Sequence, residues 1–249
     1  MAMYPRTELR DAWDTLYRSV AARVAESCPN TPLGLSWDID PHDSWSDPKM
    51  ALGQSCGWPL VTSLRDQVRV IGTFAPLIGD TVSPVYRSVI VAREGAIHSE
   101  LGRARAGVNS TDSLSGWISL LAAFQVESSE WPGAKVVTGS HASSIEALRK
   151  NEADVAAIDA VTWAHHRRLA PQSLTGLGVI AHGPEVPCLP IVVPIATDAA
   201  AVEAWRHSFE SAMLDPNLSD VRDALFIADF VRRDLVDYET ALTEFERFR

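Results

Sequence analysis

Two clusters of small polar residues have the types and spacing that could bind a ligand. The first, 109–116 (NSTDSLSG), lies between the short apolar stretch 106–108 and the apolar stretch 117–124. The second, 138–144 (TGSHASS), follows another apolar stretch and precedes a helix-like pattern. The first backbone N–H groups of a helix have no partner inside it, and the helix dipole adds partial positive charge there. Two such helix starts predict a binding site for a small anion.

Five residues of these clusters are candidate ligand contacts, namely Ser113, Ser115, Gly116, Ser140 and His141. The serine hydroxyls would donate to the anion, and the glycine would let it approach the helix start. A neutral imidazole at the second helix start could donate one hydrogen bond. The alternative is purely local, because serines at these positions cap helices in many proteins and the histidine could cap its own turn.

A third candidate, Asp159, follows the apolar stretch 154–158. Strand-like and helix-like stretches alternate here, with strands expected at 106–108, 135–138 and 154–158 and helices at 117–124 and 141–150. Such alternation predicts an α/β sheet with helices on its faces, and ligands in these sheets lie at the carboxyl ends of the strands. We therefore expect both clusters and Asp159 at one sheet edge. The alternative for Asp159 is a turn residue.

Periodicity predicts the remaining elements. The expected helices cover residues 7–26, 202–213 and 221–230, and the expected strands cover residues 68–73 and 86–92. A short strand near Gln54 and Ser55 should break into a glycine-flanked turn, and its carboxyl end would project these two donors toward a ligand. The acidic stretch 36–48 matches no calcium loop and is expected to be a surface loop. The stretch 165–168 (HHRR) is expected to be a solvated basic helix end.

Composition narrows the class of protein. The chain has 249 residues, a net charge of −10, 46% apolar residues and 22% charged residues. The negative charge argues against nucleic acid as a partner, and no apolar stretch is long enough for membrane insertion. Cys28, Cys56 and Cys188 form neither a disulfide framework nor a zinc pattern, so no metal and no cofactor are expected. The start lacks an export signal, which predicts a cytoplasmic protein as sequenced, or a periplasmic one if a signal was removed.

The order and spacing of five segments resemble those of a known group of proteins. The chain resembles the type II periplasmic-binding-protein superfamily and, within it, the phosphate/phosphonate-binding receptors of ABC transporters. The segments that carry the resemblance are 53–58 (GQSCGW), 86–91 (YRSVIV), 109–116, 139–143 (GSHAS) and 154–159 (DVAAID).

The resemblance implies two Rossmann-like α/β lobes joined by two crossing strands, with the ligand clamped between them. Lobe 1 would hold residues 1–87 plus 186–249, and lobe 2 would hold 88–185. The family's hydroxyl loop falls on 113–116, its histidine on His141 and its amine-pairing acid on Asp159. Its aromatic residues fall on Tyr86 and Tyr4. Leu114 interrupts the three adjacent hydroxyls of the family, which removes one donor from the loop.

These observations favour a solute-binding protein that clamps a small anionic ligand, with a transporter permease as partner. The alternative is a cytosolic enzyme on the same fold, similar to menaquinone-pathway lyases or thiamine-pyrimidine synthases. Cys56, His141 and Asp159 would then be its acid/base candidates. A regulatory binding module is a third alternative, although no helix-turn-helix or basic patch supports a DNA-binding one.

Overall fold

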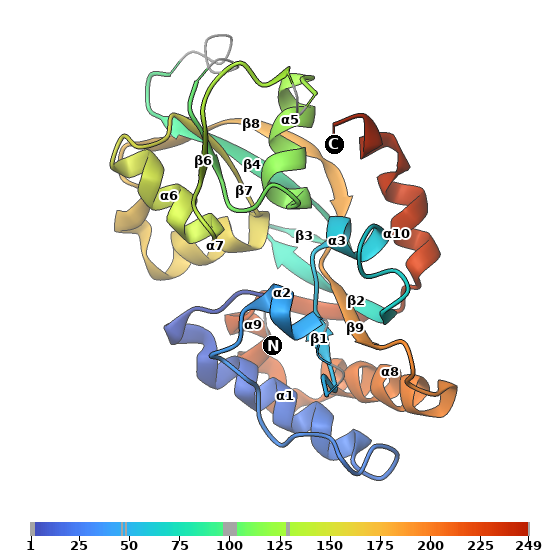
Figure 1. Ribbon diagram of the computed structural model, residues 1–249. Helices are drawn as coiled ribbons and strands as arrows, with labels where there is room; N and C mark the ends of the chain where they lie inside the picture. The colour runs from blue at the N-terminus through green and yellow to red at the C-terminus, as the bar shows by residue number, and fades with distance from the viewer. Residues whose placement is uncertain (1–2, 46, 48, 97–103, 128–129, 249) are drawn as a thin grey trace. The chain divides into compact units, whose positions relative to one another are not determined.

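The computed structural model describes residues 3–45, 47, 49–96, 104–127 and 130–248 (Figure 1). Contacts divide the chain into two units. The first unit contains Met1–Pro84 and Pro187–Thr240, and the second contains Val85–Val186 and Ala241–Arg249. The chain thus passes between units after residues 84, 186 and 240. The sequence-based division placed crossings at 87/88 and 185/186 and assigned the tail from 241 onward to the first lobe.

The second unit is built on the sheet β6-β5-β7-β4-β8. Its strands are β4 (Val85–Arg93), β5 (Ala106–Val108), β6 (Lys135–Val137), β7 (Val155–Ile158) and β8 (Leu177–Pro187). β5 runs parallel to both β6 and β7, with Gly107 opposite Val136 and Ala156, whereas β4 is antiparallel to β7. The carboxyl ends of β5, β6 and β7 therefore lie at the same edge of this sheet.

Helices cover both faces of that sheet (Figure 1). They are η2 (Leu114–Ile118), α5 (Ser119–Phe124), α6 (His141–Arg149), α7 (Ala160–Leu169), η4 (Pro171–Leu174) and η6 (Thr243–Phe248). One face packs Val89, Val91 and Ile158 against Ile145 and Leu148 of α6, with α7 and η4 alongside. Because side chains alternate along a strand, the other buried residues of β7 face the opposite side, where α5 contacts β4 and β7. The C-terminal η6 packs against α5.

The first unit contains the sheet β1-β9-β2-β10, with β3 paired to β2. The strands are β1 (Gly53–Gln54), β2 (Val68–Ile78), β3 (Thr81–Val82), β9 (Pro190–Pro194) and β10 (Ile227–Val231). The helices are η1 (Thr7–Leu9), α1 (Arg10–Val24), α2 (Pro41–Trp45), α3 (Gly57–Val61), α8 (Ala199–Leu214), η5 (Pro216–Leu218), α9 (Ser219–Ala224) and α10 (Leu235–Leu242), the last of which continues into the second unit.

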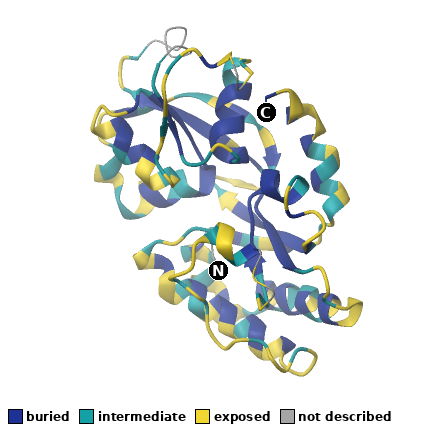
Figure 2. Ribbon diagram, in the orientation of Figure 1, coloured by how far each residue is buried: buried dark blue, intermediate teal, exposed yellow. Residues whose placement is uncertain are grey.

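Aromatic side chains fill the core of the first unit. The rings of Phe209 and Phe230 stack with centroids 5.1 Å apart, and Phe74 meets Phe209 edge-on at 5.6 Å. α8 packs on β2 and β10, and α1 packs on α8. Burial in both units is concentrated on the strands and on the inner faces of the helices (Figure 2).

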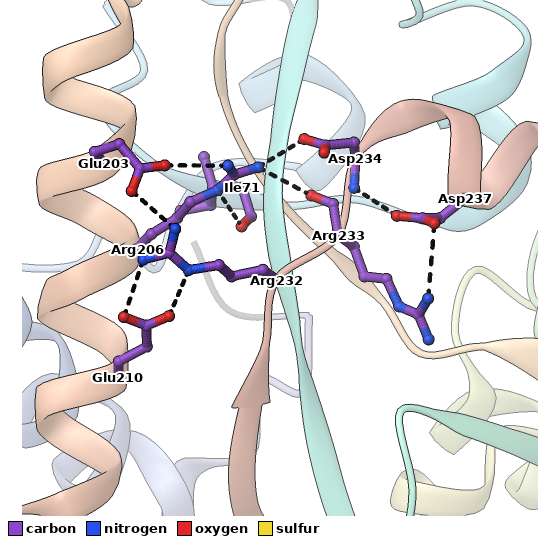
Figure 3. A network of polar contacts seen from close by, with 8 residues as sticks. All are labelled: Ile71, Glu203, Arg206, Glu210, Arg232, Arg233, Asp234 and Asp237. Carbon is purple, nitrogen blue, oxygen red and sulfur yellow. Dashed lines mark hydrogen bonds and ion pairs between the residues drawn. The ribbon is translucent and has the colours of Figure 1, made fainter.

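A network of ion pairs on the first unit fastens α8 to the segment that follows β10 (Figure 3). Arg206 donates to the Ile71 carbonyl at 3.0 Å and to Asp234 at 2.6 Å. Arg232 bridges Glu203 and Glu210 of α8, and these hydrogen bonds raise the pKa of its guanidinium. Each of these arginines has acidic or carbonyl partners within the protein, so we interpret the network as stabilising the fold.

Several expected elements are confirmed, including the helix near 7–26 and the strand–helix series from 106 to 158. The expected helix 221–230 is wrong beyond Ala224. Phe226 adopts a left-handed backbone with φ of 57°, and the chain then forms β10, because Phe230 is needed in the aromatic core. Hydrophobic spacing alone did not separate these two outcomes.

Three shorter expectations are also corrected. The surface loop 36–48 contains the helix α2, while residues 46 and 48 lie outside the described residues. The turn expected after Ser55 is the short helix α3. His165 and His166, expected to be solvated, are buried, and His166 Nδ1 lies 2.7 Å from the hydroxyl of Ser173.

None of the helices in the described residues has the length and apolar character needed to cross a membrane.

Candidate functional site

The carboxyl ends of three parallel strands position the predicted site residues of the second unit. Asn109 follows β5, the segment 138–141 follows β6, and Asp159 follows β7. We call the loops after these three strands the carboxyl edge. Across it, the Ser115 hydroxyl oxygen lies 2.9 Å from Nε2 of His141. The two helix starts singled out in the sequence therefore converge.

A π-helical turn, η2, presents Ser115. Its i to i−5 hydrogen bond runs from the Ile118 amide to the Ser113 carbonyl at 3.1 Å. π-turns are rare and often occur at functional sites. The turn continues into α5, so the expected helix 117–124 begins three residues earlier than its apolar pattern suggested.

Ser113 caps the π-turn and is buried. Its hydroxyl oxygen accepts from the Gly116 amide at 3.1 Å and from the Asn109 side-chain amide at 2.9 Å. A hydroxyl oxygen has two lone pairs and one hydrogen. Both lone pairs of Ser113 are thus engaged by the protein, and its hydrogen remains as a donor.

Gly116 makes room for the side chain of Asn109. A Cβ atom at position 116 would lie 1.7 Å from Asn109 Oδ1 and 3.0 Å from the Ser113 hydroxyl oxygen. A side chain at this position would displace Asn109, which holds Ser113, and the role of Gly116 in letting a ligand approach stays a prediction. Sequence reasoning passed over Asn109, although an amide side chain directly after a buried strand is a signal that could have indicated it.

A hydroxyl group caps the second helix start. The exposed Ser140 caps α6 by accepting from the Ser143 amide at 3.0 Å, and the two hydroxyls lie 2.8 Å apart. Thr138 ties this loop to β5, because its amide donates to the Val108 carbonyl at 2.8 Å. Gly139 has φ of 86°, a left-handed conformation that favours glycine.

His141 is the first residue of α6 and is half-buried, with its Nδ1 atom inaccessible to solvent. Burial lowers the pKa of this imidazole, and the Asp159 carboxylate and the Ala157 carbonyl act in the opposite direction. Nδ1 nevertheless makes no full hydrogen bond with the described residues. The balance keeps the ring neutral near pH 7.

Asp159 performs the local role that was its alternative. It is 1% exposed and caps α7, with Oδ1 accepting from the Val161 amide at 2.8 Å and the Thr162 amide at 3.0 Å. Its charge still acts on His141 across the carboxyl edge. The residue is thus both a helix cap and an acidic group whose charge acts on His141.

The remaining predicted contacts have separate environments. Tyr86 is buried on β4. Gln54 is buried on β1 and accepts from the Met3 amide at 3.1 Å. Ser55 is buried, and its amide donates to the Pro190 carbonyl at 3.0 Å. Tyr4 is half-buried. Gln54, Ser55 and Tyr4 belong to the first unit, and their role toward a ligand stays a prediction.

Cys56, the thiol of the enzyme alternative, is buried at the N-cap of α3 in the first unit. Within the described residues, no three His, Cys, Asp or Glu side chains gather closely enough to hold a metal ion. At the carboxyl edge, the groups identified above are hydroxyls, amides, one imidazole and one carboxylate. This set can bind and orient an oxyanion through neutral donors.

The chain is similar to known proteins in sequence and in fold. The family described as the periplasmic substrate-binding protein of phosphonate ABC transporters matches residues 56–238. No curated protein sequence gives a significant match. The chain has the fold of solved structures at low sequence identity. PhnD1 from Prochlorococcus marinus in complex with methylphosphonate is 14% identical, with a TM-score of 0.75 over 99% of this chain and 95% of that chain.

Two further structures share the fold. A binding-protein component of an ABC phosphonate transporter from Pseudomonas aeruginosa is 14% identical, with a TM-score of 0.73 over 94% of this chain and 80% of that one. A Xanthomonas citri protein bound to ATP is 15% identical, with a TM-score of 0.67 over 95% of each chain. The chain has the two-sheet α/β architecture of type II periplasmic binding proteins, and it belongs to the family of periplasmic substrate-binding proteins of phosphonate ABC transporters.

Proposed function

We propose that the carboxyl edge of the second unit binds a small oxyanion, a phosphonate, phosphate or related ion, which the protein delivers to a transporter permease. The observation that carries this proposal is the 2.9 Å contact between the Ser115 hydroxyl and His141 Nε2, because it joins two helix starts at one place. Family membership supports the same class of ligand.

The donors for such a ligand are neutral. They are the hydroxyl of Ser115, the remaining hydrogen of Ser113 and the amides at the start of η2 and α6, while His141 contacts the Ser115 hydroxyl through Nε2. Charge-assisted hydrogen bonds of this kind contribute about 1.5–3 kcal/mol each. Ser140 and Tyr86 remain further candidates. Leu114 is 2% exposed and turned into the core, so the loop has no third hydroxyl at that position.

Asp159 makes an amine on the ligand favourable. A buried carboxylate opposes a nearby anion, and a cationic group on the same ligand would offset that repulsion. An aminoalkyl phosphonate should therefore bind more tightly than its alkyl counterpart of equal length. Replacing Asp159 with asparagine should reduce this difference, because the amide retains an oxygen for capping α7 but lacks the charge.

Calorimetric titration of the purified chain tests the proposal, with methylphosphonate, an aminoalkyl phosphonate, phosphate and methanesulfonate as probes. Ser115→Ala should weaken binding by about 10- to 100-fold, the equivalent of one charge-assisted hydrogen bond. Ser63→Ala is the matched control, because Ser63 is exposed in the first unit. This variant should bind the anions as the wild type does. A folded wild type that binds none of the four anions would overturn the proposal. The same holds if Ser115→Ala binds an anion as tightly as the wild type does.

A further inference from the structure

Resting on the proposed function, we propose that anion binding at the carboxyl edge is coupled to the uptake of one proton by His141. The coupling follows from the hydrogen atoms available around the ring. The Ser115–His141 pair would then do more than contact the ligand, because the complex would form only with a protonated His141 ring.

Only one hydrogen can lie between Ser115 Oγ and His141 Nε2, which are 2.9 Å apart. If the neutral ring carries its hydrogen on Nδ1, the Ser115 hydroxyl must donate to Nε2. That hydroxyl hydrogen is then not available to an anion. In this state the Ser115 hydroxyl hydrogen is used within the pair, and only the lone pairs of its oxygen face the ligand.

The other neutral form of the ring is also unsatisfactory. With the hydrogen on Nε2, the ring donates to Ser115, but Nδ1 becomes an acceptor. Nδ1 is inaccessible to solvent, and the acceptor that acts on this ring from the backbone is the Ala157 carbonyl. A buried ring nitrogen lone pair without a donor is unfavourable.

The protonated ring resolves both problems. Nε2–H donates to Ser115, both ring nitrogens carry hydrogens so that neither has an unsatisfied lone pair, and the Ala157 carbonyl and the Asp159 carboxylate favour the positive charge. The Ser115 hydroxyl hydrogen is released and can donate to the anion. The proton comes from solvent and remains on the ring, so no covalent step is involved.

The charged surroundings fix the direction of the coupling. From the elements around it, the ring faces Ser115 of η2, the Ala157 carbonyl of β7 and the Asp159 carboxylate at the start of α7. On its own helix, Glu146 pairs with Arg149 and Lys150 at the outer surface. Burial keeps the free ring neutral, and an arriving anion supplies the negative charge that raises its pKa.

The test is calorimetric titration of the full chain with methanesulfonate, which stays fully ionised, in buffers of different ionisation enthalpy. We expect close to one proton taken up per anion bound at a pH between the His141 pKa values of the free protein and the complex. In that interval the dissociation constant should rise about tenfold per pH unit. Methylphosphonate, titrated above its second ionisation, should give the same uptake, and nitrogen NMR of the histidine rings should place the proton on His141.

A variant at position 141 separates the effect of the titrating proton from the effect of the hydrogen bond to Ser115. His141→Gln places an amide nitrogen near the position of Nε2, so it can donate to Ser115 without titrating. Its anion affinity should fall because the ring contact with Ser115 is altered, and the binding that remains should show neither the proton uptake nor the pH dependence. His182→Gln is the matched control, because His182 is exposed on β8, and it should behave like the wild type.

The measurements distinguish failure of the proton coupling from failure of the proposed anion site. Wild-type binding with no proton uptake and a flat pH profile overturns the coupling and leaves the anion site standing. Binding of none of the anions overturns both proposals. If His141→Gln does not fold, the wild-type uptake and the NMR assignment still decide the matter.

Discussion

The two edges of the sheet in the second unit use polar groups in opposite ways. At the carboxyl edge, Ser115 and His141 meet through a single neutral contact. At the other edge, where β5 and β7 begin, Asp154 accepts from Arg105 Nε at 2.9 Å and from Arg93 at 2.8 Å. We call Arg93, Arg105 and Asp154 the amino edge. Its groups are charged and paired, and they hold three strands together.

This difference is the one expected if the amino edge stabilises the sheet and the carboxyl edge binds the anion. The hydrogen bonds from Arg105, followed by those from Arg93, lower the pKa of Asp154 well below its usual range, so the carboxylate is charged at any physiological pH. Arg93 also donates to the carbonyls of Leu148 and Ala153, which leaves little capacity for a ligand. The carboxyl edge keeps a donor in reserve on Ser113 and a neutral ring on His141. We therefore expect the edge with more charge to be the poorer anion site.

The largest expected effect is at the carboxyl edge, with Gly116→Ala. The new methyl group overlaps Asn109 and crowds the Ser113 hydroxyl, so the π-turn loses its cap. Anion affinity should fall by about 100- to 10,000-fold, the equivalent of two charge-assisted hydrogen bonds. Calorimetric titration measures the loss, and thermal unfolding reports the accompanying destabilisation.

Two further variants sharpen this result. Gly34→Ala is the control, because a Cβ atom there meets nothing within 4 Å. Combining Gly116→Ala with Asn109→Ala should recover part of the lost stability, since the overlap is then removed. No recovery in the double variant would show that the Asn109 contact is not the cause.

The second effect is on the amino edge, with Asp154→Asn. Removing the carboxylate leaves two arginines without their counter-ion and should lower the free energy of unfolding by about 2 kcal/mol. This is less than for a fully buried pair, because the arginine side chains are 38% and 41% exposed. Chemical denaturation measures the change. Anion affinity of the folded variant should remain that of the wild type, and a parallel loss of affinity would contradict the division between the two edges.

The pH dependence of that loss follows from the lowered pKa of Asp154. A carboxylate with a depressed folded-state pKa stabilises the protein above its unfolded pKa, about 3.9, and loses that contribution as pH falls through the folded value. The stability difference between wild type and Asp154→Asn should be constant near neutral pH and should shrink below about pH 4. Denaturation curves across this range check the sign, and a difference that grows on acidification would refute it.

The smallest expected effect is that of Ser140→Ala. The variant loses the cap of α6 and should be less stable by about 1 kcal/mol. Ser140→Asp, which can still cap, should restore stability but repel an anion. If the Ser140 hydroxyl also contacts the ligand, Ser140→Ala weakens binding as well, by less than Ser115→Ala does, since its oxygen already serves Ser143. Thermal unfolding and titration together separate the two roles.

Much of the second unit could be predicted because its signals are local. The strands before Asn109 and Asp159 are apolar and short, and the polar residues after them begin helices, so strand ends and helix starts coincide. Parallel pairing then places them at one edge. The helix expected to reach Phe230 failed for the opposite reason, because its residues are recruited by a core formed from distant segments.

The detailed geometry of the carboxyl edge was not accessible from the sequence. That Gly116 faces Asn109, and that Asp159 caps α7, depends on side-chain directions that spacing does not fix. The burial of His165 was missed because its neighbours are basic and the stretch has the composition of an exposed helix end. The proximity of Ser115 and His141 was expected, yet the 2.9 Å distance between the hydroxyl oxygen and Nε2 emerges only from the structure.

Because the chain leaves the ribosome from its N-terminus, the division into two units affects which sheet can form first. Strand β2 must wait for β9 and β10, since Thr73 pairs with Pro190 and with Val231, whereas all five strands of the second unit are synthesised between residues 85 and 187. The inserted unit can therefore acquire its sheet first, while the earlier-made N-terminal segment still lacks its partners. During biosynthesis, this nascent N-terminal segment is the part most exposed to chaperones and proteases.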